Sequence, residues 1–434
     1  MDVATRLDAA GLAGWVADLA GLDCADPVEI VAVLRQLERL KNAASAAQAR
    51  AMAELRAIRE AEARSAGRSV RRVASSVAGE VGLARRESPH RANVLVGIAA
   101  VLPELPHAAA LFAAGELSEW RVTVLMRETA VLSKDDRAAV DAELGPTLAD
   151  LSTGQIAAEA RKAAYRLDPH SVVARIGQAE KDRQVTLRPA PDCMAYLSGL
   201  LPAKDGVAVF ASLTKAADEA RAAGDVRSKG QVMADTLIAR VTGQEPAGGI
   251  DIEVQVVMTD EALLGDSDTP ARLNGYGPIP AGLARSLIAF AAGADRAWIR
   301  RLYAPPGEGR LVGMESTARR FPQGMKDFIA ARDGVCRTPF CGAPIRHADH
   351  VTPVRAGGIT SVGNGQGLCE QCNYLKEQPG WSVTAEPDGS IVVRTPTGHA
   401  YLSRPPDLPH EPKRRRVRPA GVPFHADLYH RKVA

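Results

Sequence analysis

Aromatic residues are scarce in this chain, at 4% of its 434 residues. Alanine and leucine supply much of the apolar fraction, which favours packed helices over a sheet core rich in aromatic side chains. Long apolar runs are also missing. The run between Arg91 and Glu104 covers only twelve residues, too short to cross a bilayer. The start MDVATRLDAA has no basic run followed by an apolar segment, so we expect no secretory signal and a cytoplasmic protein.

A strong net charge is absent as well. Lys and Arg number 54 and Asp and Glu 51, which leaves +3 and by itself says nothing about nucleic acid. The charge is unevenly distributed, because residues 404–434 carry eight basic and three acidic side chains, a local charge of +5. The run Lys413, Arg414, Arg415 and Arg416 could contact phosphates, with an affinity that falls as salt rises. A solvated tail is an equally good interpretation.

Hydrophobic periodicity divides the chain into regions. We predict a multidomain fold with a mainly α region over 1–180, a small mixed α/β continuation over 181–318, a zinc-stapled module over 319–403 and a basic, disordered tail over 404–434. Ser152 and Gln155 predict a capping box before a helix. The segment MAYLSGLL (194–201) reads as a helix, and Pro387-Asp388-Gly389 predicts a hairpin turn.

The six cysteines are unevenly placed, and four of them fall within 37 residues. Four residues separate Cys336 from Cys341, and two separate Cys369 from Cys372. Both gaps let a turn aim two thiolates at one point, as tetrahedral zinc requires. The segment is too small to hold itself together by a core, so a structural zinc would stabilise it. The alternative is four reduced cysteines with packing roles.

Polar residues of particular kinds lie between the cysteine pairs. Asp349 and His350 are adjacent, Asn364 follows fourteen residues later, Asn373 nine after that and Lys376 one helical turn further. Taken singly, each has an ordinary structural explanation. Asp349 or Asn373 could cap a helix, His350 could be structural and Asn364 could serve a turn. Taken jointly, inside a cysteine clamp, they favour a hydrolytic site.

These residues carry a resemblance to a known family. The segment from about Phe321 to Trp381 resembles an HNH endonuclease module, whose catalytic unit is a ββα-metal finger. The Asp-His pair and the two asparagines are similar to the HNH domain of the CRISPR effector nucleases. Because Asn373 stands where the wider family often has His, this is an H-N-N variant. The phrases LFAAGELSEWRV (111–122) and DVRSKGQVMADTLIARVTG (225–243) resemble an actinobacterial group. In that group a helical domain of unknown function precedes an HNH module, often in mobile-element-linked (REP) repeat-family proteins.

The resemblance implies a metal-dependent endonuclease that hydrolyses phosphodiester bonds of DNA, with RNA not excluded. His350 would act as general base, because its unperturbed pKa is near neutral. Asp349 and Asn373 would hold Mg²⁺ or Mn²⁺, and Asn364 would orient the loop and the base. Lys376, and more weakly Arg355, would neutralise phosphate charge. The helical region would serve as a platform, with a homodimer as one possibility. The alternatives are a zinc-stabilised nucleic-acid-binding protein without cleavage and an interaction scaffold.

Overall fold

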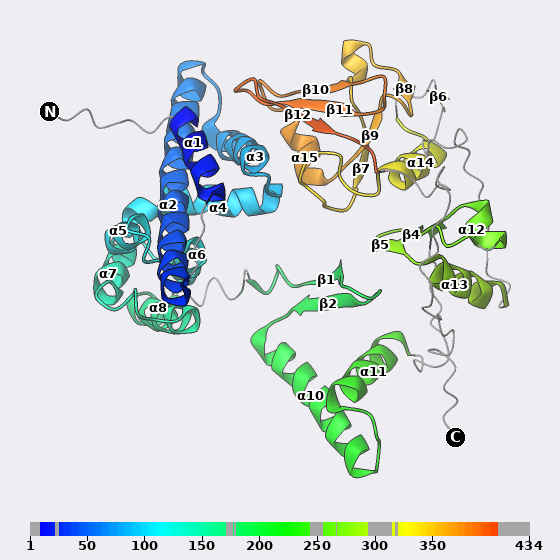
Figure 1. Ribbon diagram of the computed structural model, residues 1–434, viewed down its shortest axis with the longest axis horizontal. Coiled ribbons are helices and arrows are strands. Elements are labelled where there is room, and N and C mark those ends of the chain that lie inside the picture. The colour runs from blue at the N-terminus through cyan, green and yellow to red at the C-terminus, as the bar shows by residue number, and fades with distance from the viewer. Residues whose placement is uncertain are drawn as a thin grey trace.

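The computed structural model describes residues 9–21, 26–170, 177, 179–243, 255–265, 267–293, 315–316 and 320–406 (Figure 1). Helices make up the first part of the chain, and small sheets appear only after residue 183. A four-cysteine cluster lies in the C-terminal module. The predicted multidomain class, with a mainly α N-terminal region and a small cysteine-clamped module, is therefore confirmed. The basic run 413–416 lies outside the described residues.

Serine side chains start many helices of the N-terminal region. The helical region consists of α1 (Ala9–Ala20), α2 (Pro27–Ser65), η1 (Val70–Arg72), α3 (Val73–Arg85), α4 (Pro89–Val101), η2 (Leu102–Glu104), α5 (Pro106–Ala113), α6 (Glu119–Glu128), α7 (Lys134–Leu144) and α8 (Thr153–Leu167). Serines cap α4, α6, α7 and α8 by accepting a backbone amide of the first turn. The predicted capping box of Ser152 and Gln155 is confirmed at the start of α8.

The long helix α2 forms the spine of this region, with the shorter helices packed along it (Figure 1). Between them lies one continuous apolar core that includes Phe112, Leu95, Leu105, Leu125 and Ile156, none more than 1% exposed. Each such side chain contributes about 2 kcal/mol by leaving water. In the described residues no single helix is long and apolar enough to span a membrane. The bent pair Pro89–Glu104 and Pro106–Ala113 meets the length and composition test, although much of it lies in this core.

The middle of the chain begins with a β-hairpin and a helix pair. Strand β1 (Gln184–Pro189) pairs antiparallel with β2 (Ala195–Leu200), and α10 (Ala203–Ala222) contacts α11 (Lys229–Thr242). The predicted helix at 194–201 is wrong. Asp192 and Cys193 adopt positive φ angles of 58° and 57°, which turn the chain back on β1. The backbone groups of 195–200 then pair across the hairpin instead of along a helix.

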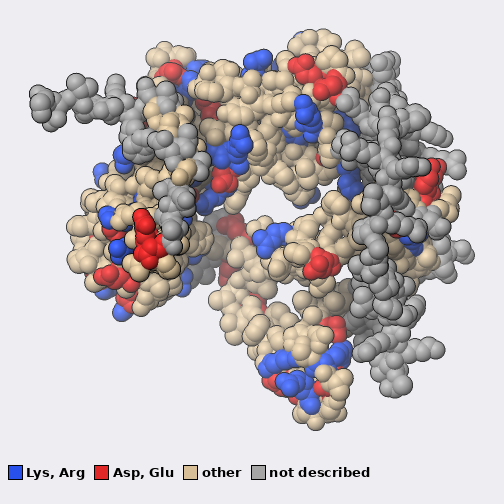
Figure 2. All heavy atoms as spheres, in the orientation of Figure 1, with Lys and Arg blue, Asp and Glu red and all other residues tan. Residues whose placement is uncertain are grey.

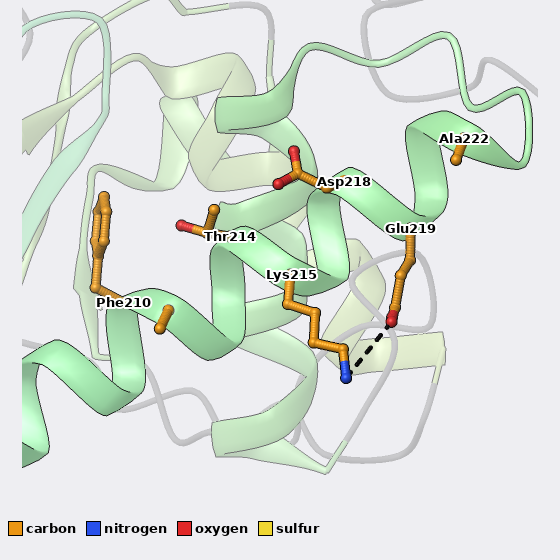
Figure 3. Close-up of a pocket in the computed structure, with 7 residues that line it drawn as sticks. Phe210, Thr214, Lys215, Asp218, Glu219 and Ala222 are labelled. Atoms are coloured by element: carbon orange, nitrogen blue, oxygen red, sulfur yellow. Dashed lines mark ion pairs between the residues drawn. The ribbon is translucent and has the colours of Figure 1, made fainter.

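This hairpin and helix pair bury little apolar surface. Every residue of β1 and β2 is exposed, and the buried positions of α10 and α11 are Ala217 and Val232. Figure 3 shows an open groove on α10, where Phe210 and Asp218 flank Thr214 and the ion pair of Lys215 and Glu219 lies at its edge. The large apolar side chains left exposed include Val185, Leu187, Tyr196, Leu197, Leu200, Val207 and Phe210.

A small sheet with two helices follows. It consists of β3 (Val256–Val257), α12 (Asp260–Leu264), β4 (Ala271–Leu273), β5 (Gly277–Ile279) and α13 (Ala281–Gly293), with the strands in the order β3-β4-β5. Its core is built on Ala271, Ile279 and Ala284. The Tyr276 hydroxyl lies 3.0 Å from the carbonyl oxygen of Met194, which ties this sheet to the β1–β2 hairpin.

The C-terminal module combines three sheets and two α-helices. Its elements are β6 (Glu315–Ser316), α14 (Gln323–Asp333), β7 (His347–His350), η4 (Val354–Ala356), β8 (Thr360–Ser361), β9 (Gly365–Leu368), α15 (Glu370–Leu375), β10 (Ser382–Ala385), β11 (Ile391–Arg394) and β12 (Ala400–Ser403). Strand β7 pairs with β9 and β6 with β8, while β10, β11 and β12 form a meander. The predicted hairpin at Pro387–Gly389 is confirmed, since it joins β10 to β11.

Candidate active site and metal centre

A β-hairpin and a short helix form the frame of the site. Strand β7 pairs with β9 so that Asp349 lies opposite Gln366 and His350 opposite Gly365. Helix α15 follows β9 directly, with Cys369 as its N-cap, and packs against β7. Side chains of successive strand residues point to opposite faces. Asp349 and His350 therefore meet different neighbours.

Asp349 faces α15. The ammonium nitrogen Nζ of Lys376 lies 2.5 Å from Asp349 Oδ2 and donates a hydrogen bond to the His350 carbonyl oxygen at 2.9 Å. Asp349 Oδ2 is buried, and among the described residues it accepts no hydrogen bond of normal geometry. Asn373 lies one turn before Lys376 on the same helix face. A carboxylate oxygen and an amide oxygen are ligands that hard divalent cations prefer, so these residues fit such an ion.

His350 faces the other way, toward α14 and β8. Its ring is stacked at a tilt on Phe321, with the centroids 4.4 Å apart, and its Nε2 lies 3.0 Å from the Thr360 hydroxyl. Burial lowers the pKa of His350 below its ordinary value, and the nearby charge of Asp349 only partly offsets this. The imidazole is therefore neutral near pH 7 and can accept a proton.

Asn364 closes the loop that joins β7 to β9. Its Oδ1 accepts the Thr352 amide at 2.8 Å, and its Nδ2 donates to the carbonyl oxygens of Thr352 and Ile359 at 3.0 and 2.8 Å. The loop is so tight that a Cβ at Gly358 would lie 1.8 Å from the Thr352 oxygen. Only glycine fits there. Asn364 thus holds together, by hydrogen bonds to its backbone, the loop that follows His350.

A pair of charged side chains borders the site. Arg355 Nη2 lies 2.6 Å from Glu377 Oε2, and its side chain is 74% exposed. Lys376 Nζ contacts the second oxygen of Glu377 at 3.2 Å. Burial would raise the pKa of Glu377, but hydrogen bonds from Arg355 and then Lys376 outweigh it and hold the pKa below the ordinary value. Arg355 is free to swing toward a ligand only by leaving this pair.

The sulfur atoms of the four clustered cysteines converge near the first turn of α15. All four sulfur atoms lie within 4.8 Å of one another, and Cys341 Sγ is 3.8 Å from Cys369 Sγ and 3.7 Å from Cys372 Sγ. A tetrahedron with 2.3 Å metal–sulfur bonds has edges of about 3.8 Å, so the cluster has the dimensions of a zinc site. The pKa of Cys369 is lowered by hydrogen bonds from the Cys336, Cys341 and Cys372 thiols, which favours its thiolate.

A buried ionic network connects the cluster to the rest of the module. The Asp333 carboxylate, at 0% exposure, accepts hydrogen bonds from Arg332 at 2.7 and 2.9 Å, from Arg337 Nη1 at 3.1 Å and from the Gly367 amide at 2.7 Å. Arg337 also donates to the Ser403 carbonyl oxygen at 3.0 Å. The network therefore joins α14, the first cysteine turn, β9 and β12.

The structure places the predicted residues that it describes in five groups. Asp349, Asn373 and Lys376 lie where β7 meets α15, and His350 faces Phe321 and Thr360 on the other side of β7. Asn364 lies at the loop, Arg355 at the rim and the four cysteines in their own cluster. Thr360, Phe321 and Asp333 are not among the residues predicted for the site. No motif marks Thr360, since only the fold brings it to His350. Phe321 precedes α14 and Asp333 is its last residue, and their spacing suggests nothing more than helix ends.

Comparisons with known proteins agree with this arrangement. A family model described as "Domain of unknown function (DUF222)" matches residues 32–333, and one described as "HNH endonuclease" matches residues 334–378. The chain is 28% identical to uncharacterized protein Rv3776 of Mycobacterium tuberculosis, over 88% of this chain and 82% of that protein. It is 26% identical to uncharacterized protein Rv2100 of the same organism, over 90% and 81%. No solved structure matches.

Proposed function

Because the chain belongs to the DUF222 family and carries an HNH endonuclease domain, we propose that it is a metal-dependent endonuclease that hydrolyses phosphodiester bonds of DNA. The HNH match supports a nuclease-type function in general. The observation that carries the finer proposal is the buried Asp349 Oδ2, which lies 2.5 Å from the Lys376 ammonium, accepts no hydrogen bond of normal geometry from the described residues and faces the helix that bears Asn373. Lys376 offsets the negative charge of this carboxylate, and a divalent cation held there would add the positive charge that attracts a phosphate.

Each side chain has a role in this proposal. Asp349 and Asn373 would hold Mg²⁺ or Mn²⁺, which when bound neutralises charge on the phosphate and the leaving 3′ oxygen. His350 would take a proton from the attacking water. If Nε2–H donates to the Thr360 hydroxyl, the lone pair on Nδ1 accepts that proton. Water attacks phosphorus, the bond to O3′ breaks, the departing O3′ takes a proton from solvent water, and the products carry a 5′-phosphate and a 3′-hydroxyl.

The remaining residues would bind the structural metal and the phosphate backbone and would support the loop beside His350. The four cysteines would hold a structural Zn²⁺, which their sulfur spacing supports. Asn364 would keep the loop and the base in place. Lys376 and Arg355 would meet phosphate charge. Figure 2 shows Lys and Arg intermixed with Asp and Glu on one face, in keeping with the small net charge. We assign broader DNA contact to the basic run 413–416, because it concentrates positive charge in the sequence. A cytoplasmic location is part of the same proposal.

A plasmid assay tests the catalytic proposal. Supercoiled DNA is incubated with Mg²⁺ or Mn²⁺ and either wild type, His350→Ala or His399→Ala, the last an exposed histidine of the same module. We expect nicking by wild type and His399→Ala, and a rate at least about 100-fold lower for His350→Ala at equal zinc content. Equal rates for all three would refute the proposal. Binding without nicking would instead indicate a nucleic-acid-binding protein, and a parallel RNA substrate tests the choice of DNA.

A homodimer through the helical region belongs to the same proposal. The exposed apolar side chains of β1, β2 and α10 support a homodimer, although they lie in the middle region that follows the helical region, since a two-stranded sheet exposed on both faces has little stability alone. Sedimentation velocity should show a dimer for wild type and a monomer for Phe210→Asp. A wild-type monomer at micromolar concentration would contradict this part of the proposal.

A further inference from the structure

Two segments about 300 residues apart in the chain meet beside the site. Helix α3 of the helical region contacts the end of α15 and Trp381, which follows it. The indole Nε1 of Trp381 donates to the Ser76 hydroxyl at 2.9 Å. Trp381 is 8% exposed and Leu375, the last residue of α15, is 4% exposed. The contact is therefore closed to water and hydrogen bonded.

Glycine at position 79 makes this contact possible. A Cβ built on Gly79 would lie 2.6 Å from a methyl carbon of Leu375 and 2.9 Å from the Trp381 ring. Glycine inside a helix costs about 1 kcal/mol relative to alanine. At Gly79 the absence of a side chain lets α3 approach α15 and Trp381 closely, which offsets that cost. Gly97, in the neighbouring helix α4, has nothing within 4 Å of its Cβ position and gives a matched comparison.

The contact of α3 with Leu375 and Trp381 belongs to a buried cluster that also includes the residue after His350. Leu83 of α3 shares one buried cluster with Leu375 and Trp381, and also with Val351, the residue that follows His350. Helix α3 thus contacts the end of α15 and shares a buried cluster with the residue that follows β7. Leu375 lies next to Lys376 and two residues after Asn373.

Helix α15 depends on such external support. It has only six residues, far fewer than an isolated helix needs for stability. The cysteine cluster holds its first turn through Cys369 and Cys372. At its other end, Lys376 bonds to β7, and Leu375 is enclosed by α3.

We propose that α3 is a positioning element of the nuclease site, which uses Ser76 and Gly79 to hold Leu375 and Trp381 and thereby places Asn373 and Lys376 against β7. The inference rests on the proposed function and deepens it. The helical region, besides any role as a platform, sets the geometry of the cation site. Weakening the α3 contact therefore lowers cation affinity and cleavage together, while the cysteine cluster remains intact.

A variant that separates the two elements tests this. Full-length Gly79→Leu and the control Gly97→Leu are compared with wild type by zinc content, hydrogen exchange in α15, Mn²⁺ binding and plasmid nicking. Mn²⁺ binding at the proposed site is defined as the binding that is present in wild type and lost in Asp349→Ala. For Gly79→Leu we expect faster exchange at Asn373 and Lys376, about tenfold weaker Mn²⁺ binding and slower nicking, with zinc retained. Gly97→Leu should match wild type.

A rescue variant separates packing from loss of fold. Leu375→Ala removes one of the two side chains that Gly79→Leu would strike, so the double variant should regain part of the Mn²⁺ affinity. If Gly79→Leu loses its helical signal, Ser76→Ala takes its place. It removes only the hydroxyl that accepts the Trp381 indole hydrogen bond and should weaken Mn²⁺ binding about threefold.

The outcomes distinguish the two proposals. If wild type binds Mn²⁺ and nicks DNA, and a folded Gly79→Leu protein does both equally well, the positioning role of α3 is refuted and the proposed function stands. Wild type that neither binds Mn²⁺ at Asp349 nor nicks overturns the proposed function, and this inference with it. Loss of both signals in Gly79→Leu, with recovery in the double variant, supports the inference.

Discussion

The ammonium of Lys376 lies 2.5 Å from Oδ2 of Asp349, within the site and not at its surface. The Lys376 side chain is only 9% exposed, and a hydrogen bond to the His350 carbonyl oxygen fixes its direction. A positive charge thus sits beside the carboxylate proposed to hold a divalent cation. Two cations around one carboxylate repel each other, and the repulsion is stronger where water is excluded.

Replacing this lysine should therefore strengthen cation binding. We expect Lys376→Gln to bind Mn²⁺ about tenfold more tightly at the Asp349 site, because about 1 to 2 kcal/mol of repulsion is relieved. Nicking should slow, because a charge that faces the phosphate is lost. Titration followed by electron paramagnetic resonance measures the affinity. Lys326→Gln, on the exposed side of α14, is the control, and weaker binding by Lys376→Gln would count against this account.

Loss of one cysteine should unfold the finger. Cys372→Ser removes a ligand from the four-sulfur cluster, and structural zinc contributes on the order of 10 kcal/mol in small modules. We expect bound zinc to vanish and rapid hydrogen exchange across residues 334–378, with the helical core unaffected. Elemental analysis and exchange mass spectrometry measure both. Cys193→Ser, an exposed cysteine outside the cluster, should change neither. A Cys372→Ser protein with full zinc would contradict the clamp.

Asn364→Ala should loosen the loop between β7 and β9. The substitution removes three hydrogen bonds to the loop backbone, at about 1 kcal/mol each before relaxation. We expect the free energy of unfolding of the module to fall by about 2 kcal/mol. Urea denaturation measures the loss, and faster exchange of the Thr352 amide locates it. Asn274→Ala, an exposed amide with one hydrogen bond of 3.2 Å, should have a much smaller effect.

Asp333→Asn should destabilise the module more than a loop substitution does. The change leaves Arg332 and the 3%-exposed Arg337 without a countercharge, and breaking one partner of a buried pair costs about 3 to 5 kcal/mol. Thermal unfolding of the variant beside Glu386→Gln, an exposed acid of the same module, measures the difference. Equal melting temperatures would show that the network contributes little.

Much of this protein follows from local sequence. Ser152 and Gln155 specify a capping box because both hydrogen bonds close within one turn. The cysteine spacings predict that the four thiols converge, and the hairpin β7–β9 with helix α15 brings them into one cluster that could hold a metal ion. The local sequence does not specify the structure of 194–201, because its apolar residues suit a helix and a strand equally. There the turn at Asp192 and Cys193 and pairing with β1 decided the outcome.

Other features depend on contacts that no local pattern specifies. Thr360 reaches His350, and Asp333 gathers two arginines and the Gly367 amide, only once the hairpin has closed. Gly79 resembles any helical glycine until Leu375, almost 300 residues later, occupies the space beside it. The sequence alone thus determined which candidate groups its local motifs mark, because residue types and short spacings suffice for that. Only the tertiary structure decided which groups face each other and what holds them there, because burial and packing depend on the whole fold.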